Sequence, residues 1–227
     1  MKSCIIAGLL AIAASASTSG ADFSYFVGAT IPDGDLDGYQ NSQTLSGLSG
    51  AITDVNVTLN LSGGFNGDYY AYVTHNGVTA ILLNRVGRST SSAVGYPDAG
   101  YGPGLSGESF TLDDQAAQDV HFYRSLSYTL NASLQLTGQW QPDGRAIDPL
   151  SSGATFVTAG RSGMLSVFDG VDPNGGWSLF VADVSSGGEG TLAGWGLQIT
   201  TVPEPSTSAL GSCGSAIVLF CRRAMKK

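Results

Sequence analysis

Aspartates in a short glycine-containing run are the residues of this chain best suited to hold a cation. Residues 33–38 read Asp-Gly-Asp-Leu-Asp-Gly, a spacing that brings hard oxygen atoms around one calcium ion in calcium-binding loops. Thr44 stands where such a loop has its bidentate Glu, and no flanking helices are predicted. We therefore expect a weak calcium site in an acidic loop at a sheet edge, or else a polar turn before a strand. The candidate ligands are Asp33, Asp35, Asp37, Asp68 and Asp183.

A second acidic group, Asp113, Asp114 and Asp119, has the residue types needed for acid–base catalysis. Adjacent residues of a strand point to opposite faces, so Asp113 and Asp114 are not expected to converge. We predict a solvated acidic loop here, without catalytic residues.

Histidine and cysteine provide no further reaction centre. His75 and His121 are the only histidines, 46 positions apart, and the segment between them contains no cysteine, so they supply at most part of a zinc site. His75 is expected to be an exposed turn residue and His121 a hydrogen-bonded edge residue. The chain also lacks the Gly-x-Ser-x-Gly motif of a nucleophile elbow. A non-catalytic protein is predicted.

The body of the chain is strongly acidic. Between Asp22 and Thr200 there are five Arg, no Lys, fifteen Asp and two Glu, a formal charge of −12. Such a surface repels phosphate backbones, so nucleic acid is not an expected partner. Cations, sugars and proteins remain as ligands.

Aromatic residues make a sugar the alternative ligand, because jelly-roll domains often bind sugars through aromatic rings. Tyr69 and Tyr70 are adjacent, so one strand cannot bury both. The aromatic candidates are Tyr69, Tyr70, Tyr72, Tyr96, Tyr101 and Trp140, and among them we single out Tyr96, Tyr101 and Trp140 as ligand-binding residues.

The N-terminus has the pattern of a secretory signal peptide. Lys2 precedes an apolar run from Cys4 to Ala14, which is too short to span a bilayer. Two small-residue cleavage sites follow, Ala14-Ser15-Ala16 and Ser19-Gly20-Ala21. We assign residues 1–21 to the signal peptide.

The C-terminus has three parts in a fixed order. Val202-Pro203-Glu204-Pro205 comes first, a small and apolar segment from Thr207 to Cys221 follows, and Arg222 and Arg223 begin a basic tail. This order resembles the bacterial PEP-CTERM sorting signal. The resemblance implies that residues 202–227 form a motif, a hydrophobic helix and a basic end recognised by an exosortase. It also implies export through the translocon, transient residence in the inner membrane and delivery to the cell surface or extracellular matrix.

Short strands account for the rest of the chain. Val55, Val57, Leu59 and Leu61 alternate with polar residues, the pattern of a half-buried strand. Tyr69 to Thr74 and Val78 to Leu83 flank the hairpin signal Asn76-Gly77. Gly87 to Gly107 is expected to be a loop, and Phe110 with Leu112 begins another strand.

Three predictions concern the second half of the body. Apolar residues at even positions from Leu126 to Leu136 indicate a strand, and Asp113 to Val120 is a candidate for one helical turn. Trp177 to Val181 and Trp195 to Ile199 each place a Trp and two aliphatic residues on one face, with Ser-Gly-Gly between them. We expect these two strands to form a hairpin whose tryptophans anchor the core.

Three parts of the body have sequences similar to those of one protein family. They are Thr30-Ile31-Pro32-Asp33 with Leu48 to Val57, Phe65-Asn66-Gly67-Asp68, and Asn174 to Asp183 with Gly190 to Leu197. In these parts the chain resembles the P domain, also called homo B domain, that accompanies the catalytic domain of subtilisin-like proprotein convertases. The resemblance covers Thr30 to Thr200 and implies a jelly-roll β-sandwich. The chain has no room for the catalytic domain itself.

The sequence thus predicts an all-β protein, a jelly-roll-like antiparallel sandwich over residues 22–201 between a signal peptide and a sorting helix. The expected function is that of a non-catalytic adhesion or interaction module at the cell surface or in the matrix, with polysaccharide or surface proteins as partners. The alternatives are a carbohydrate-binding module and an accessory P domain of a serine-type endopeptidase.

Overall fold

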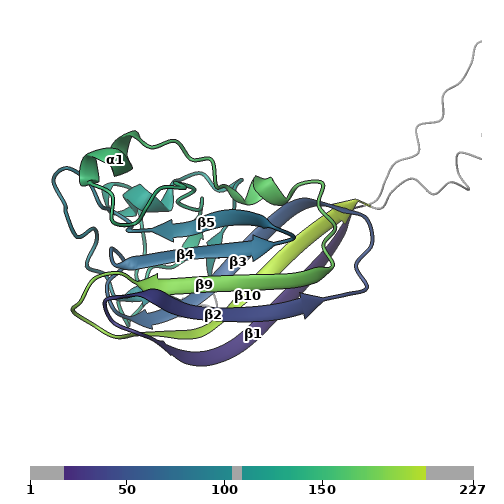
Figure 1. Cartoon of the computed structure of the whole chain (residues 1–227), viewed down its shortest axis with the longest axis horizontal. Coiled ribbons are helices and arrows are strands. Elements are labelled where there is room, and N and C mark those ends of the chain that lie inside the picture. The colour runs from purple at the N-terminus through teal and green to yellow at the C-terminus, as the bar shows by residue number, and fades with distance from the viewer. Residues whose placement is uncertain (1–17, 104–108, 203–227) are drawn as a thin grey trace, which may run out of the picture.

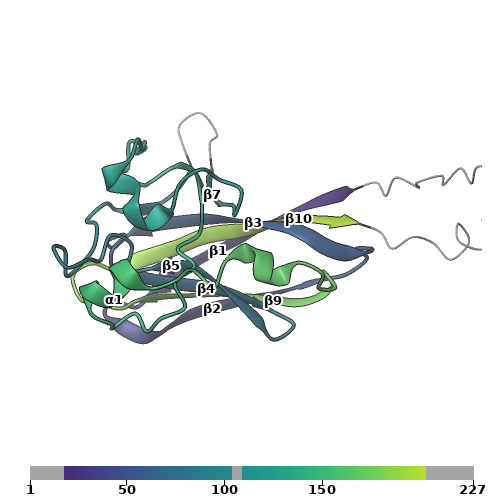
Figure 2. The same cartoon turned by 90° about the horizontal axis from the view of Figure 1, so that it is seen from above.

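Two β-sheets packed face to face form the body of the protein (Figure 1). The computed structural model describes residues 18–103 and 109–202. Viewed from above, the sheets form two layers (Figure 2). The prediction of an all-β sandwich is confirmed.

The first sheet has the order β1-β10-β3-β7-β8, with β6 also paired to β3. Its strands are β1 (Ser19–Ile31), β3 (Ala51–Gly63), β6 (Gly100–Tyr101), β7 (Phe110–Leu112), β8 (Gly138–Trp140) and β10 (Gly190–Val202). The second sheet has the order β2-β9-β4-β5. Its strands are β2 (Asp35–Leu45), β4 (Tyr69–His75), β5 (Val78–Asn84) and β9 (Gly175–Asp183). The named strands pair antiparallel except for β7 and β8, which are parallel.

Three short helices lie in the connections between strands. They are η1 (Val120–Ser125), α1 (Gly153–Thr158) and η2 (Leu165–Phe168). The helical turn predicted for Asp113 to Val120 is wrong, because the 3₁₀ helix begins only at Val120. Asp119 is the cap residue of η1, and its side chain accepts a hydrogen bond from the His121 amide.

Period-two burial produces the core between the layers. Val55, Val57, Leu59 and Leu61 of β3 are all buried, as their alternation predicts. The hairpin at Asn76-Gly77 is also confirmed, with φ angles of 48° and 78° at the two turn residues. Local patterns therefore place the central strands correctly.

The predicted hairpin of β9 and β10 is wrong. β9 pairs with β2 and β4, whereas β10 pairs with β1 and β3 in the other sheet. The connection after Asp183 therefore crosses from one sheet to the other. Both strands have one apolar face, and each sheet turns that face toward the other sheet. Trp177 and Trp195 are buried as predicted, but they come from opposite sheets.

The strand predicted from Leu126 to Leu136 is also wrong. Leu136 makes only isolated bridges to Tyr101 and Leu130. The Asn131 side-chain oxygen accepts hydrogen bonds from the amides of Ser133 and Gln135 and folds the segment into a turn. An Asn side chain that binds nearby amides competes with a β ladder, so the alternation of apolar residues here does not produce a strand.

Four strands have no counterpart in the sequence prediction: β1, β2, β6, which lies inside the predicted loop from Gly87 to Gly107, and β8. β1 begins at Ser19, opposite Thr201 of β10, and ends at Ile31, opposite Gly190. It therefore includes residues 19–21, which the sequence assigns to the signal peptide. The aspartate run of residues 33–38 covers the turn from β1 to β2 and the start of β2.

The long strands give the sandwich two distinct ends. Ser19, Ala51 and Val202 lie at one end, which we call the exit end because the described chain leaves the fold there (Figure 1). Gly63 and Gly190 are paired at the opposite end, the loop end. The 13 residues of β10 separate the ends by about 40 Å at roughly 3.3 Å per residue.

Residues 1–17 of the predicted signal peptide, and the predicted sorting segment after Val202, lie outside the described residues. Among the described residues, no helix is long and apolar enough to cross a membrane.

We predict that Gly190→Ala destabilises the fold while Gly176→Ala does not. A Cβ at residue 190 collides with the hydroxyl of the buried Tyr69, whereas a Cβ at residue 176 has no atom within 4 Å. Overpacking of this kind costs about 1–3 kcal/mol. Urea unfolding should show a lower midpoint for Gly190→Ala only, and equal midpoints for the two variants would contradict the packing described.

Candidate functional site

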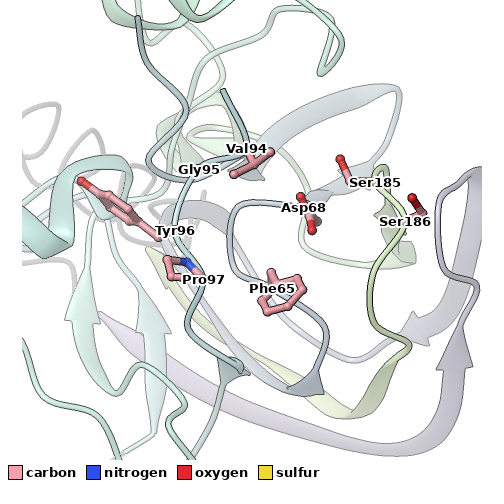
Figure 3. Close-up of a pocket in the computed structure, with 8 residues that line it drawn as sticks. All are labelled: Phe65, Asp68, Val94, Gly95, Tyr96, Pro97, Ser185 and Ser186. Atoms are coloured by element: carbon pink, nitrogen blue, oxygen red, sulfur yellow. The ribbon is translucent and has the colours of Figure 1, made fainter. Parts of the chain in front are cut away.

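An open pocket at the loop end is the best candidate for a binding site (Figure 3). Its volume is about 600 Å³, within the usual range for ligand pockets. The residues that line it are Phe65, Asp68, Val94, Gly95, Tyr96, Pro97, Ser185 and Ser186.

Three connections meet to form this pocket. The turn from β3 to β4 supplies Phe65 and Asp68, the loop after β5 supplies residues 94–97, and the crossing from β9 to β10 supplies residues 185–186. Backbone hydrogen bonds join them, from the Gly67 amide to the Tyr96 oxygen at 2.8 Å and from the Val184 amide to the Asp68 oxygen at 2.9 Å. These bonds hold the pocket walls in fixed positions.

Gly67 and Gly95 let the first two connections approach closely. A Cβ on Gly67 would collide with the Val94 carbonyl oxygen, and one on Gly95 would lie 2.6 Å from the Gly67 Cα. Only glycine therefore fits where the two backbones pack against each other.

Asp68 is a buried carboxylate on the wall of the pocket, 5% exposed. One of its oxygens lies 3.4 Å from an Arg85 guanidinium nitrogen, and the Arg85 Nε donates to the Gly67 carbonyl at 2.6 Å. Burial raises the pKa of Asp68, and the charge of Arg85 opposes that shift. The ion pair keeps a charged group next to apolar walls.

Asp183 lies at the end of β9 with an unsatisfied oxygen. Its Oδ1 accepts a hydrogen bond from the Ser185 amide at 3.2 Å. Its Oδ2 has no hydrogen-bond partner, although the residue is only 1% exposed. Burial, and then the nearby charges of Asp68 and Asp33, raise the pKa of Asp183 to about 6.

All five predicted calcium ligands lie at the loop end, where Asp35 pairs with Asp183. The Asp33 carboxylate accepts hydrogen bonds from the Gly187 and Gly188 amides, at distances from 3.0 to 3.3 Å. Within the described ranges, no group of three or more His, Cys, Asp or Glu side chains is arranged to hold a metal ion. The fold thus uses the Asp33 carboxylate to hold the crossing from β9 to β10.

Two of the five predicted ligands, Asp35 and Asp37, lie at the start of β2 and are exposed. The Asp35 side chain accepts a hydrogen bond from the Asp37 amide at 2.8 Å. It therefore stabilises a local turn, the second interpretation that the sequence offers for this run.

Of the three predicted ligand-binding aromatics, only Tyr96 lines the pocket. Tyr101 and Trp140 are 0% and 4% exposed, so their rings are not available to a ligand at the surface. Their polar atoms are satisfied internally, Tyr101 by the Asn66 carbonyl and Trp140 by the Thr137 carbonyl. Both are core residues because large rings fill the space between layers.

His75 is buried, which corrects the expectation of an exposed turn residue. It is 1% exposed and stacks on Trp177 with ring centroids 4.0 Å apart. Its ring nitrogens lie 2.9 Å from the Gly176 oxygen and 2.6 Å from the Asp172 oxygen. The ring thus ties β4 to the start of β9.

His121 is hydrogen-bonded as expected but is fully buried, not at an edge. Its Nδ1 lies 2.6 Å from an Asp143 carboxylate oxygen, and its Nε2 lies 3.0 Å from the Arg88 carbonyl oxygen. Both nitrogens are occupied by these contacts.

The second acidic group is structural rather than only solvated. Asp114 accepts hydrogen bonds from the Leu165 and Ser166 amides at the start of η2. Asp119 lies 2.9 Å from an Arg145 guanidinium nitrogen. Asp114 therefore stabilises the start of η2, and Asp119 stabilises the position of Arg145.

Sequence reasoning missed most of the pocket. Phe65, Val94 and Pro97 have no individual signal, although residues 65–68 contribute to the family resemblance and 94–97 lie in the predicted loop. Ser186 begins the Ser-Gly-Gly segment, which the sequence predicts as a hairpin turn, and Ser185 precedes it.

Comparison with known proteins leaves the family open. No protein-family model matches the chain, and no curated protein matches it. Two crystal structures of a serine protease from Aeromonas sobria are similar in structure, one of them a complex with a chaperone. The identities are 15% for the complex and 12% for the protease alone, with TM-scores of 0.43 and 0.42. The similarity covers 82% of this chain and 27% of each protease chain, so the chain spans about a quarter of their length.

We predict that Asp183→Asn stabilises the protein most at neutral and alkaline pH. Because the folded-state pKa of Asp183 is raised from 3.8 to about 6, ionisation of this group opposes folding. The cost develops between those two pH values and is constant above them. Asn resembles the protonated form, so the variant should be more stable by about 1–3 kcal/mol at pH 8 and similar to the parent near pH 4.

Thermal unfolding across this pH range tests the prediction, with Asp22→Asn in the exposed part of β1 as the control. A stability difference that does not depend on pH would show that Asp183 is not the group that titrates.

Proposed function

We propose that the protein is an exported, non-catalytic binding module displayed at the cell surface or in the extracellular matrix. The observation that carries this proposal is the position of the pocket. It lies at the loop end, whereas Val202, the first residue of the sorting motif, lies at the exit end. A sandwich attached through its C-terminal segment would therefore present the pocket away from the attachment point.

Export is proposed from the sequence at both ends of the chain. The signal-peptide pattern before Ser19 and the Val202-Pro203-Glu204-Pro205 motif with the Arg222 and Arg223 tail support translocation, exosortase processing and transient inner-membrane association. The likeness of residues 30–200 to the P domain supports a jelly-roll arrangement of the sandwich.

A non-catalytic role is supported by how the fold uses its reactive side chains. Both histidines are buried, and each ring nitrogen is close to an oxygen atom of the protein. In the predicted acid–base group, Asp114 accepts from two amides and Asp119 pairs with Arg145. A general base needs a free site within hydrogen-bond reach of a substrate.

Carbohydrate binding is the second candidate function, and Tyr96 is the observation that favours it. Of the three predicted aromatic residues, it alone lines the pocket. Aromatic rings beside polar groups are common in sugar sites, and Ser185 and Ser186 supply hydroxyls here.

The start of β1 predicts the signal-peptide cleavage site. Cleavage after Ala21 would remove three residues that pair with Thr201, Thr200 and Ile199, whereas cleavage after Ala16 leaves β1 whole. We expect the mature protein to begin at Ser17. N-terminal sequencing of the exported protein checks this, and a mature start at Asp22 would contradict it.

Cell fractionation tests the proposed function itself. The intact chain and a version ending at Val202 are expressed in the native host, and the surface and matrix fractions are probed for the body. The intact chain should be found at the surface or in the matrix, and the truncated version should be lost from those fractions. Equal distribution of the two would overturn the sorting interpretation.

A further inference from the structure

The loop end concentrates negative charge around the pocket. Six acidic residues lie there, four of them exposed, against two arginines. A further ion pair, Arg124 with Asp98, lies beside Tyr96. The six acidic residues are Asp33, Asp35, Asp37, Asp68, Asp183 and Glu189, and the two arginines are Arg85 and Arg88. A cleft with this charge attracts cationic ligands and speeds their association.

The pocket combines this charge with apolar walls. Phe65 and Val94, at 39% and 66% exposed, leave large apolar surfaces in contact with water. Tyr96 and Pro97 continue the apolar wall, and Asp68 is the one charged side chain among the lining residues. The natural complement is a ligand with an apolar stem and a positively charged head.

An unsatisfied oxygen lies directly behind this wall. The Oδ2 of Asp183 is 3.3 Å from the position that a Cβ of Gly64 would occupy, in the turn that carries Phe65. It has no partner although the residue is 1% exposed. A buried carboxylate oxygen without a donor is costly, and a cation in the adjoining pocket would reduce that cost.

We propose that the pocket binds an arginine side chain from a basic segment of a protein partner. The aliphatic part of the side chain packs on Phe65 and Pro97, and the guanidinium donates to Asp68. A guanidinium also interacts favourably with the aromatic face of Phe65. This inference rests on the proposed function, because it names the ligand class of the pocket that the module would present.

Other ligands fit the pocket less well. A calcium ion requires six to eight oxygen ligands, whereas four of the pocket residues offer apolar walls and, among the described residues, no group of three or more His, Cys, Asp or Glu side chains is arranged to hold a metal ion. A neutral sugar carries no charge, so the negative charge around the pocket does not strengthen its binding. A second copy of this body is also a poorer ligand, because it offers few free basic side chains. It has no lysine and five arginines, of which Arg85 and Arg145 are buried and Arg124 pairs with Asp98.

Peptide titration of the intact chain tests the proposal. The probes are Gly-Gly-Arg-Gly-Gly and the same peptide with citrulline, which has the shape of arginine but no charge. Backbone amide shifts of Ser185 and Ser186 report binding by NMR. The arginine peptide should bind about tenfold or more tightly than the citrulline peptide, since a hydrogen bond to a charged group contributes that much.

Matched variants locate the binding site. Asp68→Asn should weaken binding of the arginine peptide about tenfold, whereas Asp22→Asn at the exit end should leave it unchanged. Because Asp68 also pairs with Arg85, its variant can lose stability, so Phe65→Ser in the exposed wall is the second test. It should weaken the same binding severalfold while the fold is retained.

Three results would each overturn the proposal. The first is equal binding of the arginine and citrulline peptides. The second is undiminished binding of the arginine peptide by both Asp68→Asn and Phe65→Ser. The third is displacement of the arginine peptide by excess calcium chloride with the same shifts at Ser185 and Ser186, which would make a metal ion the ligand. None of these results affects the fractionation experiment, so failure of this inference is separable from failure of the proposed function.

Discussion

The contact between the two sheets across Trp177 and Trp195 is the constraint on which the rest of the structure depends. Each sheet has one apolar face that must be removed from water, and neither sheet is stable without the other. The two indoles fill the space between layers from opposite sides. Trp195 also donates from its Nε1 to the Asn41 side chain of β2 at 2.9 Å, a direct bond from one sheet to the other. Because β9 and β10 are consecutive, the chain must cross between layers at the loop end.

That crossing creates the candidate site. The segment from Asp183 to Gly188 is held by the Asp33 carboxylate on one side and by the Asp68 carbonyl on the other. These contacts place Ser185 and Ser186 in the pocket wall near Phe65, across the pocket from Tyr96 (Figure 3). The acidic residues at this end therefore have two effects. They fix the loops through hydrogen bonds to amides, and they leave a negative potential around an apolar pocket.

The exit end has the opposite character. β1 and β10 are paired to within a few residues of the point where the described chain leaves the fold. A regular pair of strands offers little freedom for a ligand-binding loop, and the pocket is separated from the point where the described chain leaves the fold by the length of the sandwich. The terminal segments and the body also differ in composition. The thiols and every lysine lie in the terminal segments, whereas the body is acidic.

Local sequence patterns were sufficient for β3, β4, β5 and the Asn76-Gly77 turn, because alternation and turn preference act over neighbouring residues. They were misleading at Leu126–Leu136, where Asn131 binds nearby amides, and at β9 and β10, where two similar apolar faces suggested a hairpin. The sequence by itself determined the all-β class, the acidic and thiol-free body, and the two tryptophans as core residues. Only the tertiary structure decided which strands pair, that Tyr101 and Trp140 are buried, and that Asp68 and Tyr96 share one pocket. The physical reason is that these relations join residues distant in sequence, and their energies depend on packing that no local pattern contains.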